Sequence, residues 1–243
     1  MKLQNKTAIV TGASTGIGRA IAIQLAKEGA TVGLIARSID KLEETKKLVE
    51  EVGGKGIVFP IDLSNLEQVN ELIKDIKLKF EKIDILVNVA GIWHGKDEVY
   101  AGKDFETFDQ KVILDTYMVG FTFPTLLIHG LLPLLANGKI INISGTFENG
   151  AKGWLPYYAS KRAIEDLTIG LSEELKGKGI NVNCISPSDV ATPEYIKYFP
   201  EDAKNANTPE DIAKKVLDFA SSDQTGQIVV MKQGKEIKEG FHK

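Results

Sequence analysis

The sequence has few of the residues that build disulfide frameworks and metal centres. It contains one cysteine, Cys184, and three histidines in 243 residues. A single cysteine excludes an intrachain disulfide, and so few histidines leave no cluster at the spacing of metal ligands. The first six residues lead directly into a strand-like run, without a signal-peptide pattern. We therefore expect a cytoplasmic protein without a metal site.

A basic stripe is also missing. The net charge is −3 and the acidic and basic residues are interspersed, which argues against nucleic acid as a partner. The chain has no repeats, low-complexity tracts or linker-like segments, and 43% of its residues are apolar. This length and composition are typical of one α/β domain with a large core. We predict a single domain over residues 1–243.

One stretch lacks charged residues altogether. Between Asp115 and Asn137 there is no Asp, Glu, Lys or Arg, and the run is close to the roughly 20 apolar residues that span a membrane. Pro124 and Pro133 interrupt it, and it falls where the pattern of elements expects a helix. We interpret it as a buried helix, covered by the sheet on one side and by another subunit on the other. Membrane anchoring is the alternative.

Strand-like and helix-like runs alternate along the whole chain, which predicts a doubly wound parallel sheet of about seven strands with helices on both faces. The expected strands are residues 7–10, 30–36, 56–61, 83–87, 139–143, 180–185 and 227–231. Pro60 favours an edge position for the third strand. Helices are expected after residue 18, from Asp40 and Ser64 (each with the spacing of a capping box), at about 157–176, and from Pro209. Residues 93–104, 145–156 and 186–207 are expected to be loops.

The rest of the chain is organised around a glycine-rich turn, Thr11 to Gly18, which connects the first strand to the first helix. Gly12 permits a tight turn, Gly16 lets the backbone approach a ligand, and Gly18 lets the helix pack closely on the strand. A helix N-terminus that follows such a turn presents free N–H groups to a phosphate. The turn therefore predicts a phosphate-binding site.

Further polar residues follow the ends of the other strands. Ligands of open α/β sheets bind beyond the carboxyl ends of the strands. Six strand ends meet there, and they carry Gly12 to Gly18, Arg37, Asp62, Asn88 to Gly91, Ser144, and Pro187 to Thr192. We expect these residues to line one cleft.

Tyr157 and Lys161 supply a pair that can exchange a proton. They are four residues apart and share a helix face. A tyrosine has a pKa of about 10 and is a poor acid or base at neutral pH. An adjacent ammonium group favours the phenolate and lowers this pKa towards the working range. The strand that ends at Ser144 brings a hydroxyl group to the same cleft.

Together these motifs resemble the short-chain dehydrogenases/reductases. The glycine-rich turn, Asp62, Asn88-Val89-Ala90-Gly91, the serine after the fifth strand and Tyr157-x-x-x-Lys161 occur in the family's order, over nearly the whole chain. The glycine spacing is similar to that of the short, single-domain branch, which includes carbonyl reductases like 3-oxoacyl-ACP reductase. The resemblance implies a Rossmann-type fold, an NAD(P)-dependent oxidoreductase and a homotetramer.

The resemblance also implies the roles of the site residues. Hydride passes between the nicotinamide and a carbonyl carbon while Tyr157 gives or takes the proton on oxygen, Ser144 hydrogen-bonds that oxygen, and Lys161 holds the nicotinamide ribose. Asp62 contacts adenine, and Val190 and Thr192 meet the nicotinamide carboxamide. The implied coenzyme-binding residues are Gly12, Ser14, Thr15, Gly16, Ile17, Gly18, Arg37, Asp62, Leu63, Asn88, Ala90, Gly91, Tyr157, Lys161, Val190 and Thr192.

Coenzyme choice can be argued from charge at the end of the second strand. A ribose 2′-hydroxyl is usually held by an acidic side chain there, whereas a 2′-phosphate needs a cation. Ala36 occupies the acidic position and Arg37 follows it, and guanidinium matches phosphate geometry. We predict NADP, with NAD as the alternative. Thr15 stands where NADP-dependent members of the family often have a second basic residue.

Three positions depart from the family's pattern. Tyr117 replaces the helical asparagine that supports a water relay to the lysine. Gly145 replaces the second of two serines, so Ser144 is chosen by its spacing to Tyr157. Ser188 replaces the glycine after Pro187. The departures at Tyr117 and Gly145 motivate the alternative of an NADP(H)-binding sensor or scaffold with little turnover, and the one at Ser188 is a smaller change.

The substrate and the assembly are less closely defined. The three loops carry aromatic residues that suit an apolar or ring-bearing substrate, although the same rings can simply pack the loops: Trp93, His94, Phe147, Trp154, Tyr195, Tyr198 and Phe199. The uncharged helix and the helix after it, with Ala163, Leu167, Gly170 and Leu171, give two apolar faces that favour a tetramer.

Overall fold

The computed structural model describes residues 1–147, 151–233 and 235–237. Its sheet has the strand order β3-β2-β1-β4-β5-β6-β7-β8. All neighbouring strands are parallel except β7 and β8, which are antiparallel. The bounds are β1 (Thr7–Thr11), β2 (Thr31–Ala36), β3 (Lys55–Pro60), β4 (Ile85–Asn88), β5 (Lys139–Ile143), β6 (Asn181–Pro187), β7 (Ile228–Lys232) and β8 (Lys235–Ile237). The predicted doubly wound parallel sheet is confirmed, with β3 at an edge as Pro60 indicates, and β8 is an addition.

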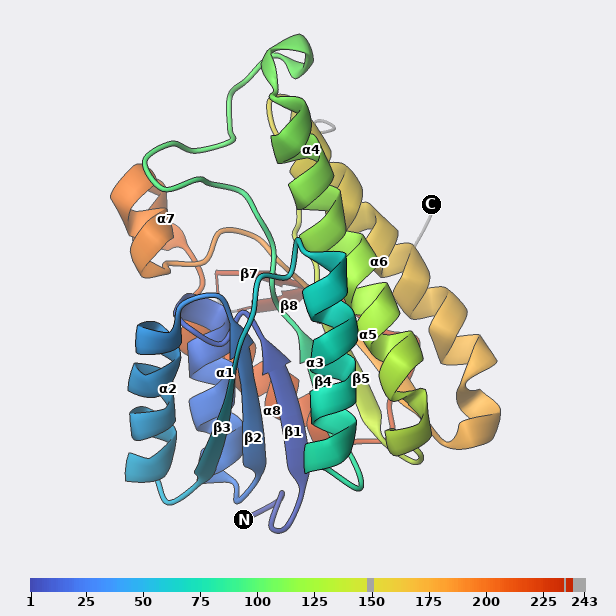
Figure 1. The fold of residues 1–243 in the computed structure, drawn as a ribbon. Helices are drawn as coiled ribbons and strands as arrows, with labels where there is room; N and C mark the ends of the chain where they lie inside the picture. Colours follow the sequence, from blue (N-terminus) through green and yellow to red (C-terminus); the bar gives the residue numbers. More distant parts are fainter. Residues whose placement is uncertain (148–150, 234, 238–243) are drawn as a thin grey trace.

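Helices cover both faces of the sheet (Figure 1). They are α1 (Gly16–Lys27), α2 (Ile39–Glu51), α3 (Leu66–Lys79), α4 (Gln110–Tyr117), α5 (Phe123–Leu131), α6 (Leu155–Glu174), α7 (Pro193–Tyr198) and α8 (Pro209–Ala220). Short 3₁₀ turns lie at Phe105–Thr107, Leu132–Leu134, Lys176–Lys178 and Asp202–Asn205. Strand order reverses between β1 and β4, because the chain builds outwards from β1 to β3 and then returns to the other side. A ligand cleft is expected at this switch point.

Two apolar cores hold the layers together. On one face, α1, α2 and α8 pack on the sheet through side chains such as Leu25, Leu42 and Phe219. On the other face, α3, α5 and α6 lie side by side over the strands, and Leu72 and Phe123 are among the side chains buried there. Fully burying one such side chain contributes about 1.5–3 kcal/mol. The sheet is therefore fixed from both sides, and only its strand ends are open.

The uncharged stretch is a broken helix. α4 runs into a π-helical turn, Met118–Thr122, then into α5, which has Pro124 in its first turn. Of the described residues, one helical run, Gln110–Leu134, is long and apolar enough to cross a membrane, and 39% of its most apolar window is buried. Its side chains Phe123 and Leu127 are fully buried in the core of the sheet. The sheet-covered side of the predicted helix is thus confirmed.

Several boundaries differ from the prediction because other residues cap the helices. Ser38, not Asp40, caps α2, and Asn65, not Ser64, caps α3, since each has extended backbone and a side-chain oxygen that accepts from a first-turn N–H. The box between Thr208 and Asp211 at α8 is present. The segment 186–207 was expected to be a loop, but it contains α7, which starts because Thr192 accepts a hydrogen bond from Tyr195 N. Part of the predicted loop 145–156, residues 148–150, lies outside the described residues.

Candidate active site

A cavity of about 1010 Å³ lies at the carboxyl ends of the parallel strands. It is lined by the glycine-rich turn, the ends of β2, β4, β5 and β6, the start of α6 and the segment that leads into α7. Of the site residues expected from the sequence, all except Asn88 line it. The strand ends thus converge on one cleft, as the sheet topology requires.

The glycine-rich turn has a geometry that other residues would disturb. Gly12 and Gly16 have positive φ angles of 66° and 50°, in a region that side chains rarely adopt. A Cβ atom at Gly18 would collide with the carbonyl oxygen of Gly12. Thr15, the N-cap of α1, makes no side-chain cap, so the N–H groups of the first turn are open towards the cavity. This arrangement suits a phosphate group.

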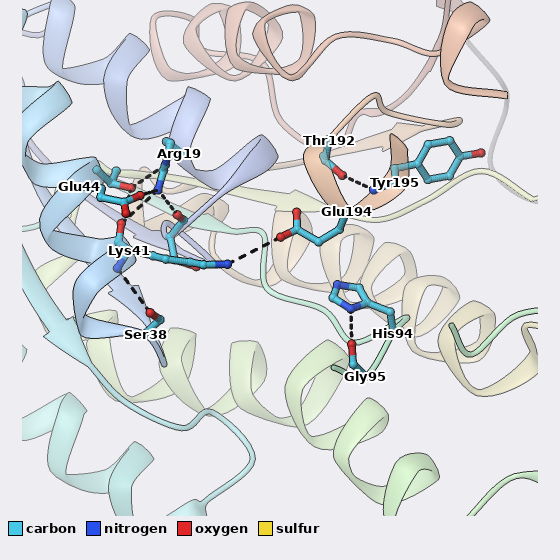
Figure 2. A network of polar contacts seen from close by, with 11 residues as sticks. Arg19, Ser38, Lys41, Glu44, His94, Gly95, Thr192, Glu194 and Tyr195 are labelled. Carbon is cyan, nitrogen blue, oxygen red and sulfur yellow. Dashed lines mark hydrogen bonds and ion pairs between the residues drawn. The ribbon is translucent and has the colours of Figure 1, made fainter. Parts of the chain in front are cut away.

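Arg19 holds the turn against α2 (Figure 2). Its guanidinium group donates to Ser14 O at 2.6 Å, to Thr45 Oγ1 at 2.9 Å and to Glu44 Oε2 at 2.9 Å. These contacts use the Arg19 guanidinium group to hold the turn in place, so it is not a candidate for ligand binding. Across the cleft, Lys41 Nζ lies 3.9 Å from Glu194 Oε1. This ion pair connects the start of α2 to the start of α7, so residues 188–205 line the cleft next to the glycine-rich turn.

Arg37 and Asp62 lie at the ends of β2 and β3. Arg37 is exposed, lines the cavity and forms no ion pair with any described residue. Burial raises the pKa of Asp62, but the hydrogen bonds from the Ser64 N–H and hydroxyl, together with the Arg37 charge, outweigh it, so this pKa lies below its ordinary value. The carboxylate is held in place at 3.0 and 2.8 Å from these two Ser64 donors.

Tyr157 and Lys161 lie together beside Gly91 at the end of β4. Lys161 Nζ is 5.2 Å from the centre of the Tyr157 ring and donates to Ile143 O at 2.9 Å. A Cβ at Gly91 would lie 3.3 Å from both Lys161 Nζ and Tyr157 Cε2. Glycine therefore lets the end of β4 pack directly on the pair.

The ionisation of this pair differs from the expectation. Burial raises the pKa of the Tyr157 phenol above its ordinary value, although the sequence predicts that Lys161 lowers it. Burial also lowers the pKa of Lys161 to about 8, against the opposing charge of Glu165. Desolvation of both groups explains these directions, because burial disfavours each charged form.

Ser144 is 3% exposed and its hydroxyl is turned towards the protein. It donates to Glu165 Oε1 at 2.6 Å, and Ser186 donates to the same oxygen at 2.9 Å. Arg162 pairs with the other oxygen, Oε2. Glu165 lies one turn after Lys161 on α6 and is 1% exposed. Sequence reasoning missed Glu165, although its i+4 spacing from Lys161 was visible.

Asn88 lies behind the cavity wall. Its amide nitrogen donates to Asn142 Oδ1 at 2.9 Å, and Asn142 donates to Thr168 Oγ1 at 2.9 Å. The Oδ1 atom of Asn88 is buried and accepts no hydrogen bond from any described residue. This chain of polar groups connects β4, β5 and α6, and it leaves one buried acceptor open next to the cleft.

Tyr117, which replaces the helical asparagine of the family pattern, is the last residue of α4. The π-helical turn follows it directly. Gly120 in that turn packs on α6, where a Cβ would lie 2.7 Å from Ser160 Oγ. The helix thus changes its winding where it packs on α6 near Ser160, as π-helical turns often do near functional sites.

Aromatic rings from three segments gather over the cavity. Trp93 lies 6.4 Å from Trp154, 6.2 Å from Tyr195 and 6.4 Å from Phe199, measured between ring centres. Phe147 lies 5.8 Å from the Tyr157 ring. Each of these rings is only partly buried. The aromatic residues of the three predicted loops therefore lie together, and they extend from α7 to Tyr157.

The described residues contain no group of three or more His, Cys, Asp or Glu side chains that could hold a metal ion. Besides Glu165, the sequence analysis missed Lys41, Ser38 and Thr146, which line the cavity. Ser38 directly follows Arg37, and Lys41 lies one turn further at the start of a helix. Their position beside Arg37 could have identified both as residues of the cavity.

The comparisons with known proteins agree over most of the chain. A family model described as short chain dehydrogenase matches residues 6–202. The 3-oxoacyl-[acyl-carrier-protein] reductase FabG of Thermotoga maritima is 31% identical, covering 94% of this chain and 97% of the relative. Subunit BbsD of (2S)-[(R)-hydroxy(phenyl)methyl]succinyl-CoA dehydrogenase from Thauera aromatica is 29% identical, covering 99% and 100%. A crystal structure of a short chain dehydrogenase from Shigella flexneri complexed with NADP superposes with a TM-score of 0.83 at 29% identity, covering 94% and 98%.

Proposed function

This chain belongs to the short-chain dehydrogenase/reductase family, and we propose that it is an NADP(H)-dependent oxidoreductase that interconverts a carbonyl group and a secondary alcohol. The observation that carries the proposal is the approach of Tyr157 and Lys161 at the end of the cavity, directly beside Gly91. The relative crystallised with NADP supports the coenzyme class.

The residues present fit a dinucleotide. The glycine-rich turn has its two positive φ angles and an uncapped helix N-terminus, which is the cradle that a pyrophosphate needs. The coenzyme, when bound, supplies or takes up the hydride. We propose that residues 12–18 bind the pyrophosphate, Asp62 and Leu63 the adenine, Ala90 and Gly91 the adenosine side, and Val190 and Thr192 the carboxamide.

Tyr157 is the proposed general acid and base. In reduction it gives its phenolic proton to the carbonyl oxygen while the carbonyl carbon accepts hydride, and in oxidation the proton returns. Its raised pKa keeps the phenol protonated before reaction, which suits reduction at neutral pH. Lys161, two of whose donors remain after the bond to Ile143 O, would hold the ribose hydroxyls.

Ser144 is proposed to hydrogen-bond the reacting oxygen. To do so, it must turn its proton away from Glu165. Ser186 donates to the same Glu165 oxygen at 2.9 Å, so that oxygen keeps a donor when Ser144 rotates. The alternative position, Gly145, has no side chain to offer.

NADP rather than NAD is proposed because of charge. Arg37 is an exposed cation at the end of β2 with no ion-pair partner in the described part of the chain. Lys41, one turn further, adds a second cation to the same end of the cavity. A 2′-phosphate beside them would meet both charges.

For the substrate, we propose a ketone or aldehyde whose non-reacting part is a planar, apolar ring. Trp93, Phe147 and Trp154 line the cavity beside Tyr157 and keep partly exposed faces there, and aromatic pairs contribute about 0.5–1.5 kcal/mol beyond area burial. The relative from Thauera aromatica, whose name includes a phenyl group, supports this class.

We further propose a single domain that works as a cytoplasmic homotetramer. Leu114 on α4 is 67% exposed, and it belongs to the same helical run whose inner side packs on the sheet. Burial of such a face against a second copy would remove apolar surface from water. Light scattering of the purified protein is expected to give four times the chain mass, and a stable monomer would contradict the assembly.

The test of the function is NADPH oxidation over a panel of aryl and alkyl ketones and aldehydes. Turnover of at least one aryl ketone is expected. Saturable NADPH binding without turnover of any panel member would instead favour a sensor or scaffold. The departures from the family pattern at Tyr117 and Gly145 are the reason for considering this alternative.

A further inference from the structure

We propose that Glu165 is a positioning residue of the active site: its buried carboxylate holds the ends of β5 and β6 against α6 and keeps Lys161 in its charged form. This inference rests on the proposed function in one respect, which is the role of Lys161 in catalysis. The contacts themselves belong to the described structure.

The carboxylate holds two strand ends to α6. Its Oε1 atom accepts from Ser144, directly after β5, at 2.6 Å and from Ser186, in β6, at 2.9 Å. Arg162 pairs with Oε2. Three donors on one carboxylate stabilise its ionised form, since an ionised carboxylate has acceptors only. Glu165 is therefore a buried anion next to the ends of β5 and β6.

Lys161 shares its helix face with Glu165, one turn away. Lys161 is 2% exposed, and its one hydrogen bond in the described structure goes to Ile143 O. A neutral carbonyl does not compensate the burial of a charge. A nearby anion has to supply that compensation if the ammonium is to persist at neutral pH.

The other titratable groups that face Lys161 cannot supply it. They are Tyr157 on α6 and Cys184 on β6. Burial raises the pKa of Cys184 to about 12 and raises that of Tyr157 as well. Both are neutral at ordinary pH. Glu165 is thus the anion among these groups, and its charge opposes the burial that lowers the pKa of Lys161 to about 8.

The test measures Lys161 directly, without substrate. Lysine side-chain NMR of the full chain, with the Lys161 signal assigned through Lys161→Met, gives its titration in the wild type, in Glu165→Gln and in Ser186→Ala. Glu165→Gln removes the charge and keeps the shape, and it is expected to lower the Lys161 midpoint by about one pH unit, because an opposite charge one helix turn away shifts a pKa by about that much. Ser186→Ala removes one hydrogen bond from the same oxygen and keeps the charge, so only a small shift is expected. An unchanged midpoint in Glu165→Gln would overturn the proposal.

Activity gives a second readout. If the midpoint falls from about 8 to about 7, Glu165→Gln reaches nearly wild-type kcat at about pH 6 and roughly one fifth of it at about pH 8. An equal loss at both pH values would mean that Glu165 has a merely structural role. If Glu165→Gln does not fold, Arg162→Gln takes its place, and it should move the Lys161 midpoint upwards; no movement would again overturn the proposal. A shifted midpoint in a protein that reduces no carbonyl would contradict the proposed function and leave the role of Glu165 in place.

Discussion

Replacing Arg37 by alanine is the sharpest test of coenzyme choice. Arg37 directly follows β2 as an exposed cation on the cavity wall and has no ion pair within the described structure. A hydrogen bond to a charged group contributes about 1.5–3 kcal/mol, and exposure reduces this for a surface pair. If the interaction of Arg37 with the 2′-phosphate contributes about 1–2 kcal/mol, Arg37→Ala is expected to raise the dissociation constant of NADPH roughly fivefold to thirtyfold.

NADH lacks the 2′-phosphate, so its affinity is expected to stay the same. The assay is fluorescence titration of both coenzymes with wild type, Arg37→Ala and Lys77→Ala. Lys77 is an exposed cation on α3, away from the cavity, and its replacement makes the same change in net charge. The NADPH difference should shrink at high salt, because exposed charges are screened there. Equal losses for NADPH and NADH, or none for either, would refute the reasoning.

Three further perturbations follow from the structure. Gly18→Ala should weaken NADPH binding at least tenfold, because its Cβ would collide with Gly12 O, whereas Gly177→Ala, with nothing within 4 Å of its Cβ, should bind normally; normal binding by both would contradict the packing argument. Trp93→Leu should remove a roughly twofold to tenfold preference for acetophenone over methyl cyclohexyl ketone without changing NADPH affinity, and a preference that persists would exclude the ring as its source. Thr208→Ala removes both hydrogen bonds of the Thr208 hydroxyl, one of which belongs to the capping box of α8, and should cost about 1 kcal/mol, or about 2–4 °C in melting temperature; no shift in calorimetry would contradict this cap.

Features that depend on nearby residues could be predicted from the sequence. The glycine-rich turn, the helix face shared by Tyr157 and Lys161, and the edge position of β3 all follow from spacing or from backbone preference over a few residues. The caps at Ser38 and Asn65 were misplaced by one or two residues, because several adjacent polar residues can serve and only the backbone conformation selects one. α7 was missed although Thr192 followed by Pro193 is a helix start.

Features that depend on tertiary contacts were not predictable in the same way. Glu165 reads as an ordinary helix residue, and only the register of β5 beside β6 brings Ser144 and Ser186 to its carboxylate. The same register turns the Ser144 hydroxyl inwards. The pKa of Tyr157 also depends on burial, which neighbours in the sequence do not reveal, so the expected lowering by Lys161 was the smaller effect.

The Tyr157 phenol is the proposed group that transfers the proton. Tyr157→Phe keeps the ring and removes the hydroxyl, so NADPH should bind with nearly wild-type affinity, while kcat for an aryl ketone should fall by about 10²–10⁴, the usual contribution of a general acid. The decisive measurement is single-turnover NADPH oxidation by wild type and Tyr157→Phe at saturating coenzyme and ketone. A loss of this size with intact binding is the predicted result, and equal rates in the two proteins would contradict the account.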